Sequence, residues 1–321
     1  MDTTKQPKLS VHPKAPGGLE RSDEDDHQAR QGRERHIGFE TQGPGMPLQP
    51  PPMFFTSDHH PLPLLDNYRG RSAFLVCSGP SLSHGQDPAF LHNLKDVVHL
   101  DGTEREEAEK QCQRMAALPQ KYDLTHFTKP GIWSMCVNNA AKVIRPNAWI
   151  CVDRPESFLL STWLDPRIQK FAPICHTRKP LFNSTVWEKV PLMVSDCPNV
   201  TYFKRNEHFQ AKQYLTEDTI NWGSSQKYGG NRSVMLAAIR VLYLLGFRRI
   251  FLVGVDLNMS KNPDEHYAFA QHRHSGSVRG NNSTYDAMKS RFTELLPYFK
   301  SAGLELYNTN PDSRLKVFPH I

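Results

Sequence analysis

The chain lacks the features that define several large classes of protein. It contains no apolar run of about 18 residues, the minimum for a membrane-spanning helix, and no apolar core of a secretory signal. Its 6 cysteines form no Cys-x-x-Cys pair, which argues against a redox motif. No internal repeat is visible. These absences predict a cytoplasmic protein with reduced cysteines and no membrane span.

The first 68 residues are poor in aliphatic side chains and rich in proline and charge. There, "LERSDEDDHQARQGRERH" is followed by "GPGMPLQPPPMFF". Such a segment cannot bury enough apolar surface to offset the entropy lost on ordering. We predict that residues 1–68 form a mostly disordered tail and that residues 69–321 form a single Rossmann-like nucleotide-binding domain.

The net charge of +6 suits an anionic small substrate or a polyanion such as nucleic acid. A solvated basic surface explains the same excess, so charge alone leaves the alternatives open.

From residue 73 onward, short apolar runs alternate with longer helical patterns. This alternation is typical of the α/β class, with a Rossmann-like, mostly parallel sheet and helices on both faces. The expected strands are 73–77, 96–100, 132–137, 148–152, 174–176, 192–194, 200–203, 250–255 and 305–307. The expected helices are 105–118, 156–163, 232–245 and 285–301.

The clearest segment reads "NRSVMLAAIRVLYLLGFRRIFLVGVDLNM". It predicts a buried helix, ended by Gly246 as the C′ residue, and then a strand buried on both faces. Asp256 follows that strand, at the edge where open α/β sheets bind ligands. A capping role is the alternative.

A strand followed by small turn residues stands at "SAFLVCSGPSLSH". It matches neither G-x-G-x-x-G nor a Walker loop. Glycine allows a close backbone approach, proline fixes φ, and serines supply hydroxyls, so the loop suits an anion or a nucleotide. A plain turn is the alternative. The candidate residues are Ser78, Gly79, Pro80 and Ser81.

A second such loop, "KYGGNRSV", precedes the buried helix. Its glycines permit unusual backbone angles, and the first turn of the helix offers free N–H groups beside an arginine. Close packing of helix on strand explains the glycines equally well. The candidate nucleotide-binding residues are Gly230, Asn231, Arg232 and Ser233.

Polar residues also follow two other expected strands. Asn138 follows "IWSMCV" and Asp153 follows "AWICV". In a parallel sheet both lie on the edge of Ser78 and Asp256, where they suit a base or a ribose. Capping is again the alternative.

Histidines cluster in "EHYAFAQHRH". Histidine is a natural general base near neutral pH, so His266, His272 and His274 are candidate catalytic residues, together with Asp256. Tyr267 is a candidate phosphate ligand. The spacing matches no zinc motif, and we expect no metal site.

The order of these motifs resembles the glycosyltransferase family 42 sialyltransferases and the related domain of unknown function 115 proteins, which include 6-hydroxymethylpterin diphosphokinases. The shared pattern runs from Ser-Gly-Pro-Ser-Leu at 78–82, through Asn138 and Asp153, to Asp256. It ends in "NPDSRL", and it covers roughly residues 72–319.

The resemblance implies a cytidine nucleotide sugar held by Ser78, Gly79, Ser81, Asn138, Asp153 and Ser233. It also implies a phosphate contact at Tyr267 and a histidine base that acts without a metal. Two departures stand out. Ser78 replaces the usual asparagine, and the segment where the family has its base histidine reads "RGNNSTY", so a histidine of 266–274 would have to substitute.

We therefore expect a nucleotide-dependent transferase, foremost a glycosyltransferase that uses a nucleotide sugar without a tightly bound cofactor. One alternative is an ATP- and Mg²⁺-dependent pyrophosphokinase acting on a hydroxymethyl group, with Asp153 and Asp256 as metal partners. Another is a nucleic-acid-associated protein. The sequence is similar to ones from tailed-phage genomes, for which DNA carrying a modified base would be a sensible acceptor.

Overall fold

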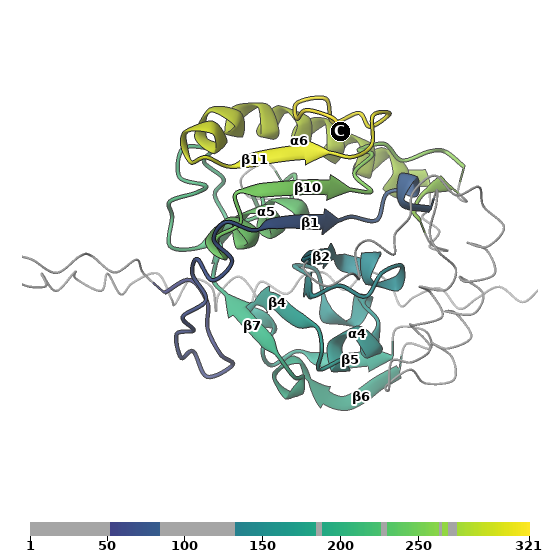
Figure 1. Cartoon of the computed structure of the whole chain (residues 1–321). Helices are drawn as coiled ribbons and strands as arrows, with labels where there is room; N and C mark the ends of the chain where they lie inside the picture. The colour runs from purple at the N-terminus through teal and green to yellow at the C-terminus, as the bar shows by residue number, and fades with distance from the viewer. Residues whose placement is uncertain (1–51, 84–131, 184–187, 226–229, 263–264, 269–274) are drawn as a thin grey trace, which may run out of the picture. The chain divides into compact units, whose positions relative to one another are not determined.

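The computed structural model describes residues 52–83, 132–183, 188–225, 230–262, 265–268 and 275–321. Its central feature is a 7-stranded sheet in the order β11-β10-β1-β2-β3-β4-β7 (Figure 1). Every neighbouring pair of strands is parallel. The prediction of an α/β fold with a mostly parallel sheet is confirmed. The strands of this sheet are β1 (Ser72–Val76), β2 (Ser134–Val137), β3 (Ala148–Ile150), β4 (Gln169–Pro173), β7 (Val200–Phe203), β10 (Arg249–Val253) and β11 (Glu305–Asn308).

Two smaller strand pairs and a set of helices complete the described part. The antiparallel pair is β5 (Pro180–Asn183) with β6 (Glu188–Met193), and the short parallel pair is β8 (Arg205–Asn206) with β9 (Ile220–Asn221). The α-helices are α4 (Leu160–Leu164), α5 (Val234–Leu244) and α6 (Ser275–Ser301). The 3₁₀ helices are η1 (Pro80–Ser83), η3 (Asn138–Lys142), η4 (Pro155–Ser157), η5 (Ile174–His176) and η6 (Val194–Asp196).

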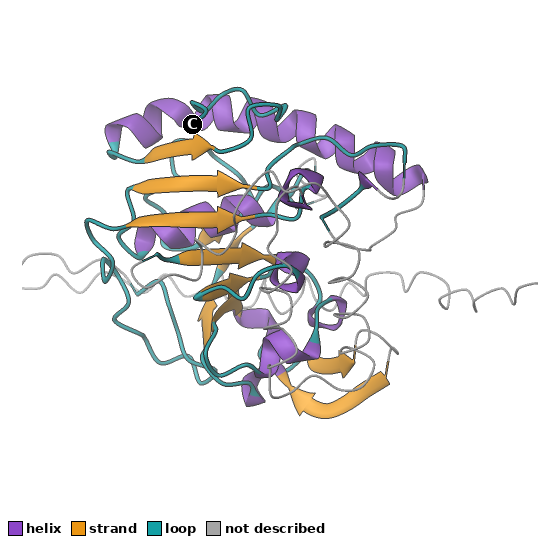
Figure 2. Cartoon of the chain, turned by 45° about the vertical axis from the view of Figure 1, so that its right-hand side comes forward, coloured by secondary structure: helices purple, strands orange, loops and turns teal. Residues whose placement is uncertain are grey.

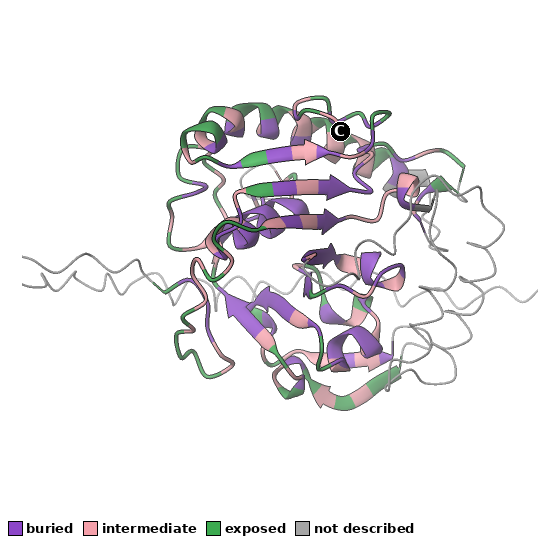
Figure 3. Cartoon of the chain, viewed as in Figure 1, coloured by how far each residue is buried: buried purple, intermediate pink, exposed green. Residues whose placement is uncertain are grey.

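Both faces of the sheet are covered. Successive side chains of a strand point to opposite faces, so neighbouring residues belong to different core clusters. Leu75 and Leu252 belong to one core cluster, which also takes in the buried faces of α5 and α6. Val76 and Val253 belong to the other, with Trp163 of α4. Figure 2 shows α6 running beside β11, and Figure 3 shows buried residues throughout α5 and the central strands. The sheet therefore lies between two helical layers.

The chain reverses its direction of travel across the sheet at β1. From β1 it moves outward through β2, β3, β4 and β7, and it then returns to place β10 and β11 on the other side of β1. The carboxyl ends of β1 and β10 therefore flank a topological switch point, which is where open α/β sheets bind ligands.

Most expected elements are present, with corrections. The strand expected at 174–176 is wrong: these residues form η5, and the strand is β4, just before them. β4 was not predicted from the sequence, because the buried Lys170 interrupts its apolar pattern. The expected helix 156–163 is divided into η4 and α4. The expected elements 96–100 and 105–118 lie outside the described residues.

The last helix starts earlier than its apolar pattern predicts. It begins at Ser275 and not at Tyr285, although the added turns contain weak helix formers. Tertiary contacts support them: the side chain of Asn282 accepts a bond from Met259 N at 2.9 Å and donates one to Met259 O at 2.9 Å. Gly246 has φ 104° after α5, so its predicted C′ role is confirmed.

Residues 52–71 form a strap that packs onto the sheet, although the sequence predicts a tail as far as residue 68. The N–H groups of Phe55 and Tyr202 each donate to the other's carbonyl at 2.8 Å, so the strap pairs with edge strand β7. Phe54 is fully buried. The boundary at residue 68 is therefore wrong for residues 52–68, whose aromatic side chains offset the cost of ordering a proline-rich segment. Residues 1–51 lie outside the described part.

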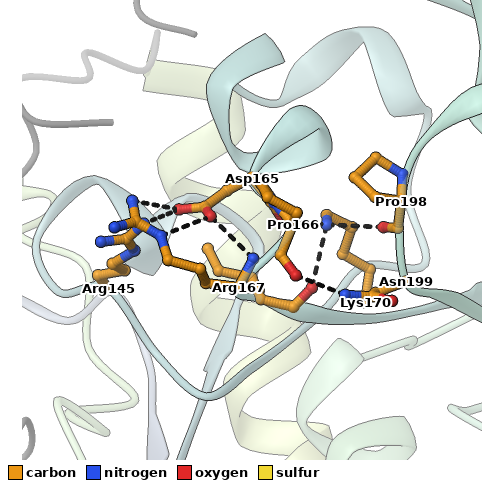
Figure 4. Close-up of polar contacts among 8 residues, drawn as sticks. Arg145, Asp165, Pro166, Arg167, Lys170, Pro198 and Asn199 are labelled. Atoms are coloured by element: carbon orange, nitrogen blue, oxygen red, sulfur yellow. Dashed lines mark hydrogen bonds and ion pairs between the residues drawn. The ribbon is translucent and has the colours of Figure 1, made fainter. Parts of the chain in front are cut away.

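A buried charged group lies at the amino ends of β4 and β7 (Figure 4). The Lys170 side chain is 0% exposed, and its ammonium donates to three backbone carbonyls. Burial lowers the pKa of Lys170 to about 8. The ammonium thus stays protonated at neutral pH, with all three N–H groups used. The acceptors are Asp165 O at 2.5 Å, Pro198 O at 2.9 Å and Ile168 O at 3.0 Å.

The carboxylate of Asp165 extends this group. It is 1% exposed and pairs with Arg145 at 2.5 Å and with Arg167 at 3.1 Å (Figure 4). Lys170 binds the backbone carbonyl of the same aspartate. We call Arg145, Asp165, Arg167 and Lys170 the amino-edge cluster.

Candidate functional site

The loop after β1 is joined to the loop after β10 by backbone hydrogen bonds. Gly79 N donates to Gly254 O at 2.9 Å, and Leu82 N donates back to Gly79 O at 3.0 Å. Ser81 N donates to the carboxylate of Asp256 at 2.9 Å. The N–H groups of Gly79, Ser81 and Leu82 in this loop are therefore already engaged within the protein.

Only glycine fits at position 79. A Cβ there would lie 2.3 Å from Asp256 Oδ2 and 2.5 Å from Gly254 O, both far below van der Waals contact. The glycine is thus required for the close approach of two protein segments, whereas the sequence suggested an approach to a ligand.

Asp256 connects three parts of the chain. Its Oδ2 accepts from Ser81 N, and its Oδ1 accepts from the side chain of Asn310. Its backbone carbonyl accepts from Arg314 N at 2.9 Å. These contacts match the capping interpretation of Asp256, while a catalytic role stays a prediction. Sequence reasoning gave no role to Asn310. The position of the "NPDSRL" segment, which the resemblance had singled out, was the available signal.

Asn138 and Asp153 meet at the ends of β2 and β3, as predicted. Asn138 Nδ2 donates to Asp153 Oδ2 at 3.5 Å, and Trp149 Nε1 donates to Asn138 O at 2.7 Å. Asn138 has φ 48°, in the left-handed region that asparagine tolerates better than most residues. Trp149 thus binds the backbone of Asn138, and Asp153 binds its side-chain amide.

Two buried polar atoms at this edge have no partner among the described residues. They are Ser81 Oγ and Asn138 Oδ1. Buried polar atoms in native proteins nearly always have a partner, so each such atom calls for an explanation. A ligand bound across the ends of β1 and β2 would supply one. We call Ser78, Gly79, Ser81, Asn138, Asp153 and Asp256 the carboxyl-edge site.

The segment 265–268 lies against this site. Ala268 N donates to Ser78 O at 3.1 Å, and Ala268 packs in the same core cluster as Leu82. His266 is 2% exposed, and its ring contacts that of Tyr267 edge to face. The structure thus brings His266 and Tyr267 to the loop of Ser78. The other two candidate bases, His272 and His274, lie outside the described residues.

The loop before α5 has the backbone geometry that its sequence suggests. Gly230 and Asn231 have φ values of 72° and 60°. Ser233 is the N-cap, because its hydroxyl accepts from Met235 N at 3.2 Å. Arg291 of α6, a residue that sequence reasoning missed, donates to Asn231 O at 2.8 Å and holds the loop in place.

The C-terminal end of α5 contacts the strap just before β1, because Asp66 N donates to Leu244 O at 2.9 Å. The helix therefore runs antiparallel to the strands, and its N-terminus faces the carboxyl side of the sheet. The two predicted nucleotide loops therefore share this side of the sheet.

The thiol of Cys77 is next to the site but is not a nucleophile. Burial first, and the charge of Asp256 second, raise the pKa of Cys77 to about 12. The thiol is therefore protonated at neutral pH. Cys77, Cys136, Cys151 and Cys197 form no disulfide with another described residue, and their reduced state stays a prediction.

Among the residues described, no three His, Cys, Asp or Glu side chains gather closely enough to hold a metal ion. Over the same residues, no helix combines the length and the apolarity needed to cross a bilayer. A scan against protein-family models finds no match for this chain, and a search of curated proteins finds none either.

Proposed function

We propose that the protein is a nucleotide-dependent transferase, and foremost a glycosyltransferase that moves a sugar from a nucleotide sugar to an acceptor hydroxyl. The observation that carries this proposal is the carboxyl-edge site. Polar groups from β1, β2, β3 and β10 gather around the switch point of a parallel sheet, where two buried polar atoms have no partner among the described residues.

His266 is the general base in this proposal. It lies on a segment that is hydrogen bonded to Ser78, and it is buried. As the acceptor oxygen bonds to the anomeric carbon, its proton passes to the imidazole, and the bond to the nucleotide breaks with its electron pair on the phosphate. The positive end of α5 and the guanidinium of Arg232 would stabilise that leaving phosphate.

A thermal-shift screen of nucleotides and nucleotide sugars, with and without Mg²⁺, tests the class. A ligand that binds only the folded protein raises Tm, by an amount that grows with its concentration. Transfer that survives EDTA supports glycosyl transfer. A strict requirement for Mg²⁺ and ATP points instead to the pyrophosphokinase alternative, and the lack of any shift across the set argues against the whole class.

The Arg232→Ala variant tests the phosphate side. Loss of a charged hydrogen bond to phosphate weakens nucleotide binding by about tenfold or more. Arg249→Ala is the matched control, because Arg249 lies at the opposite edge and pairs with Glu305. Titration calorimetry that gives equal nucleotide affinities for both variants would remove Arg232 from the site.

A further inference from the structure

The loop after β1 has the shape of an anion loop, but two of its backbone donors, Gly79 N and Ser81 N, already bind protein groups. Gly79 N donates to Gly254 O, Ser81 N donates to Asp256, and Pro80 has no N–H at all. The carboxylate of Asp256 thus takes the place that a phosphate oxygen would occupy at Ser81 N. A phosphate could bind there only by displacing that carboxylate.

The charge around the loop disfavours an anion as well. Asp256 lies under the loop, and Asp153 lies two strands away, in hydrogen-bond contact with Asn138. The raised pKa of Cys77, caused by burial and by the charge of Asp256, agrees with a negative potential here. A phosphate at this edge would face carboxylates, while Gly79 N and Ser81 N are already bound to protein acceptors.

Both atoms that remain open can accept a hydrogen bond. The amide nitrogen of Asn138 donates to Asp153, so its Oδ1 is left to accept a bond. Ser81 Oγ is the second open atom, and a hydroxyl can accept a bond as well as donate one. A ligand that completes Asn138 Oδ1 must therefore bring a hydrogen-bond donor, and a second donor on that ligand would also complete Ser81 Oγ.

We infer that the edge formed by Ser81, Asn138 and Asp153 binds the uncharged, donor-bearing part of the nucleotide, and that the phosphates bind elsewhere. Ribose hydroxyls and the exocyclic amine of a base share the required chemistry. This inference rests on the proposed function, and it reverses the sequence-based assignment of phosphate to the Ser78–Ser81 loop.

Calorimetry on the full-length chain separates the two parts of the ligand. The probes are nucleoside monophosphates, their 2′,3′-dideoxy forms and inorganic pyrophosphate. Asn138→Gly removes the acceptor and keeps a residue suited to φ 48°, and Ser81→Ala removes the hydroxyl while keeping the N–H bond to Asp256. Thermal unfolding of each variant checks that it folds.

We expect Asn138→Gly to weaken binding of the preferred monophosphate about tenfold or more, and to change pyrophosphate binding less than about twofold. If the unaltered chain binds the dideoxy form as weakly as Asn138→Gly binds the ordinary monophosphate, the ribose is the group bound. If the unaltered chain binds the dideoxy form with full affinity, the base amine is the group bound. Pyrophosphate affinity that falls with either variant, or monophosphate affinity unchanged in both, overturns the inference alone. Failure of every nucleotide and nucleotide sugar to bind the unaltered chain overturns the proposed function as well.

Discussion

The two edges of the sheet differ in how far their buried polar groups are satisfied. At the amino edge, the ammonium of Lys170 has three N–H groups and three carbonyl acceptors, and Asp165 pairs with two arginines. Only one buried side-chain atom of this cluster, Arg145 Nε, has no partner among the described residues. At the carboxyl edge, Ser81 Oγ and Asn138 Oδ1 are equally out of reach of water but have no described partner.

From this difference we infer a structural network at the amino edge, and we propose a binding site at the carboxyl edge. A buried polar group with its partners in place costs little and fixes local geometry, whereas one without a partner costs about 1–3 kcal/mol. The amino-edge cluster therefore serves the fold. The carboxyl-edge site carries a cost that a bound ligand can recover, and the three predictions that follow test this contrast.

The largest expected effect comes from breaking the amino-edge cluster. Asp165→Ala leaves two arginines without their buried carboxylate, and we expect a loss of about 3–5 kcal/mol in the free energy of unfolding, measured in urea. Arg167→Ala is the control, since that side chain is 52% exposed and should cost no more than about 1 kcal/mol. Nucleotide affinity should stay unchanged in both variants. A small loss for Asp165→Ala would mean that the cluster is not structural.

The next effect couples stability and nucleotide binding at the carboxyl edge. Gly79→Ala places a methyl group 2.3 Å from Asp256 Oδ2 and should cost about 1–3 kcal/mol of stability. It should also abolish nucleotide binding, because the loop and the carboxylate must part. Gly280→Ala in α6 is the control, as its Cβ meets nothing within 4 Å. If Gly79→Ala binds nucleotide normally, the loop is not part of the site.

The smallest effect is a pH dependence from Lys170. Its folded pKa is about 8 and its ordinary value is 10.5, so the unfolded chain binds more protons between these values. The free energy of unfolding must then rise with pH across this window, by on the order of 1–2 kcal/mol. Urea unfolding at pH 8 and pH 10, compared between the unaltered chain and Lys170→Met, isolates the contribution of Lys170 to this pH dependence. A relative loss of stability at pH 10 would show that folding raises the pKa of Lys170 instead of lowering it.

Sequence patterns predicted the fold class and most strands, because parallel strands buried on both faces leave long apolar runs such as "IFLVGV". They failed where a polar residue is buried or an apolar one lies in a proline-rich context. β4 was missed because Lys170 interrupts it, and Phe54 was assigned to a tail although it is fully buried. In both places the local structure depends on contacts with residues far away in the sequence.

Within the site, the sequence predicted that Ser78, Asn138, Asp153 and Asp256 lie at one edge, because the carboxyl ends of parallel strands meet at the same edge of a sheet. It did not predict that the carboxylate of Asp256 would accept a hydrogen bond from Ser81 N, nor that the side chain of Asn310 would donate to the same carboxylate. The residues of such a loop are the same whether its N–H groups are free to bind a ligand or already bind another part of the protein.

The sequence by itself thus determined the secondary structure of the central sheet and the polar character of the strand ends, because both depend on local periodicity and turn residues. Tertiary structure alone decided the strand order and which donors remain open. The hydrogen bond from Ser81 to Asp256 spans 175 positions of sequence. No local pattern encodes such a contact, which forms only when β1 and β10 become neighbours in the sheet.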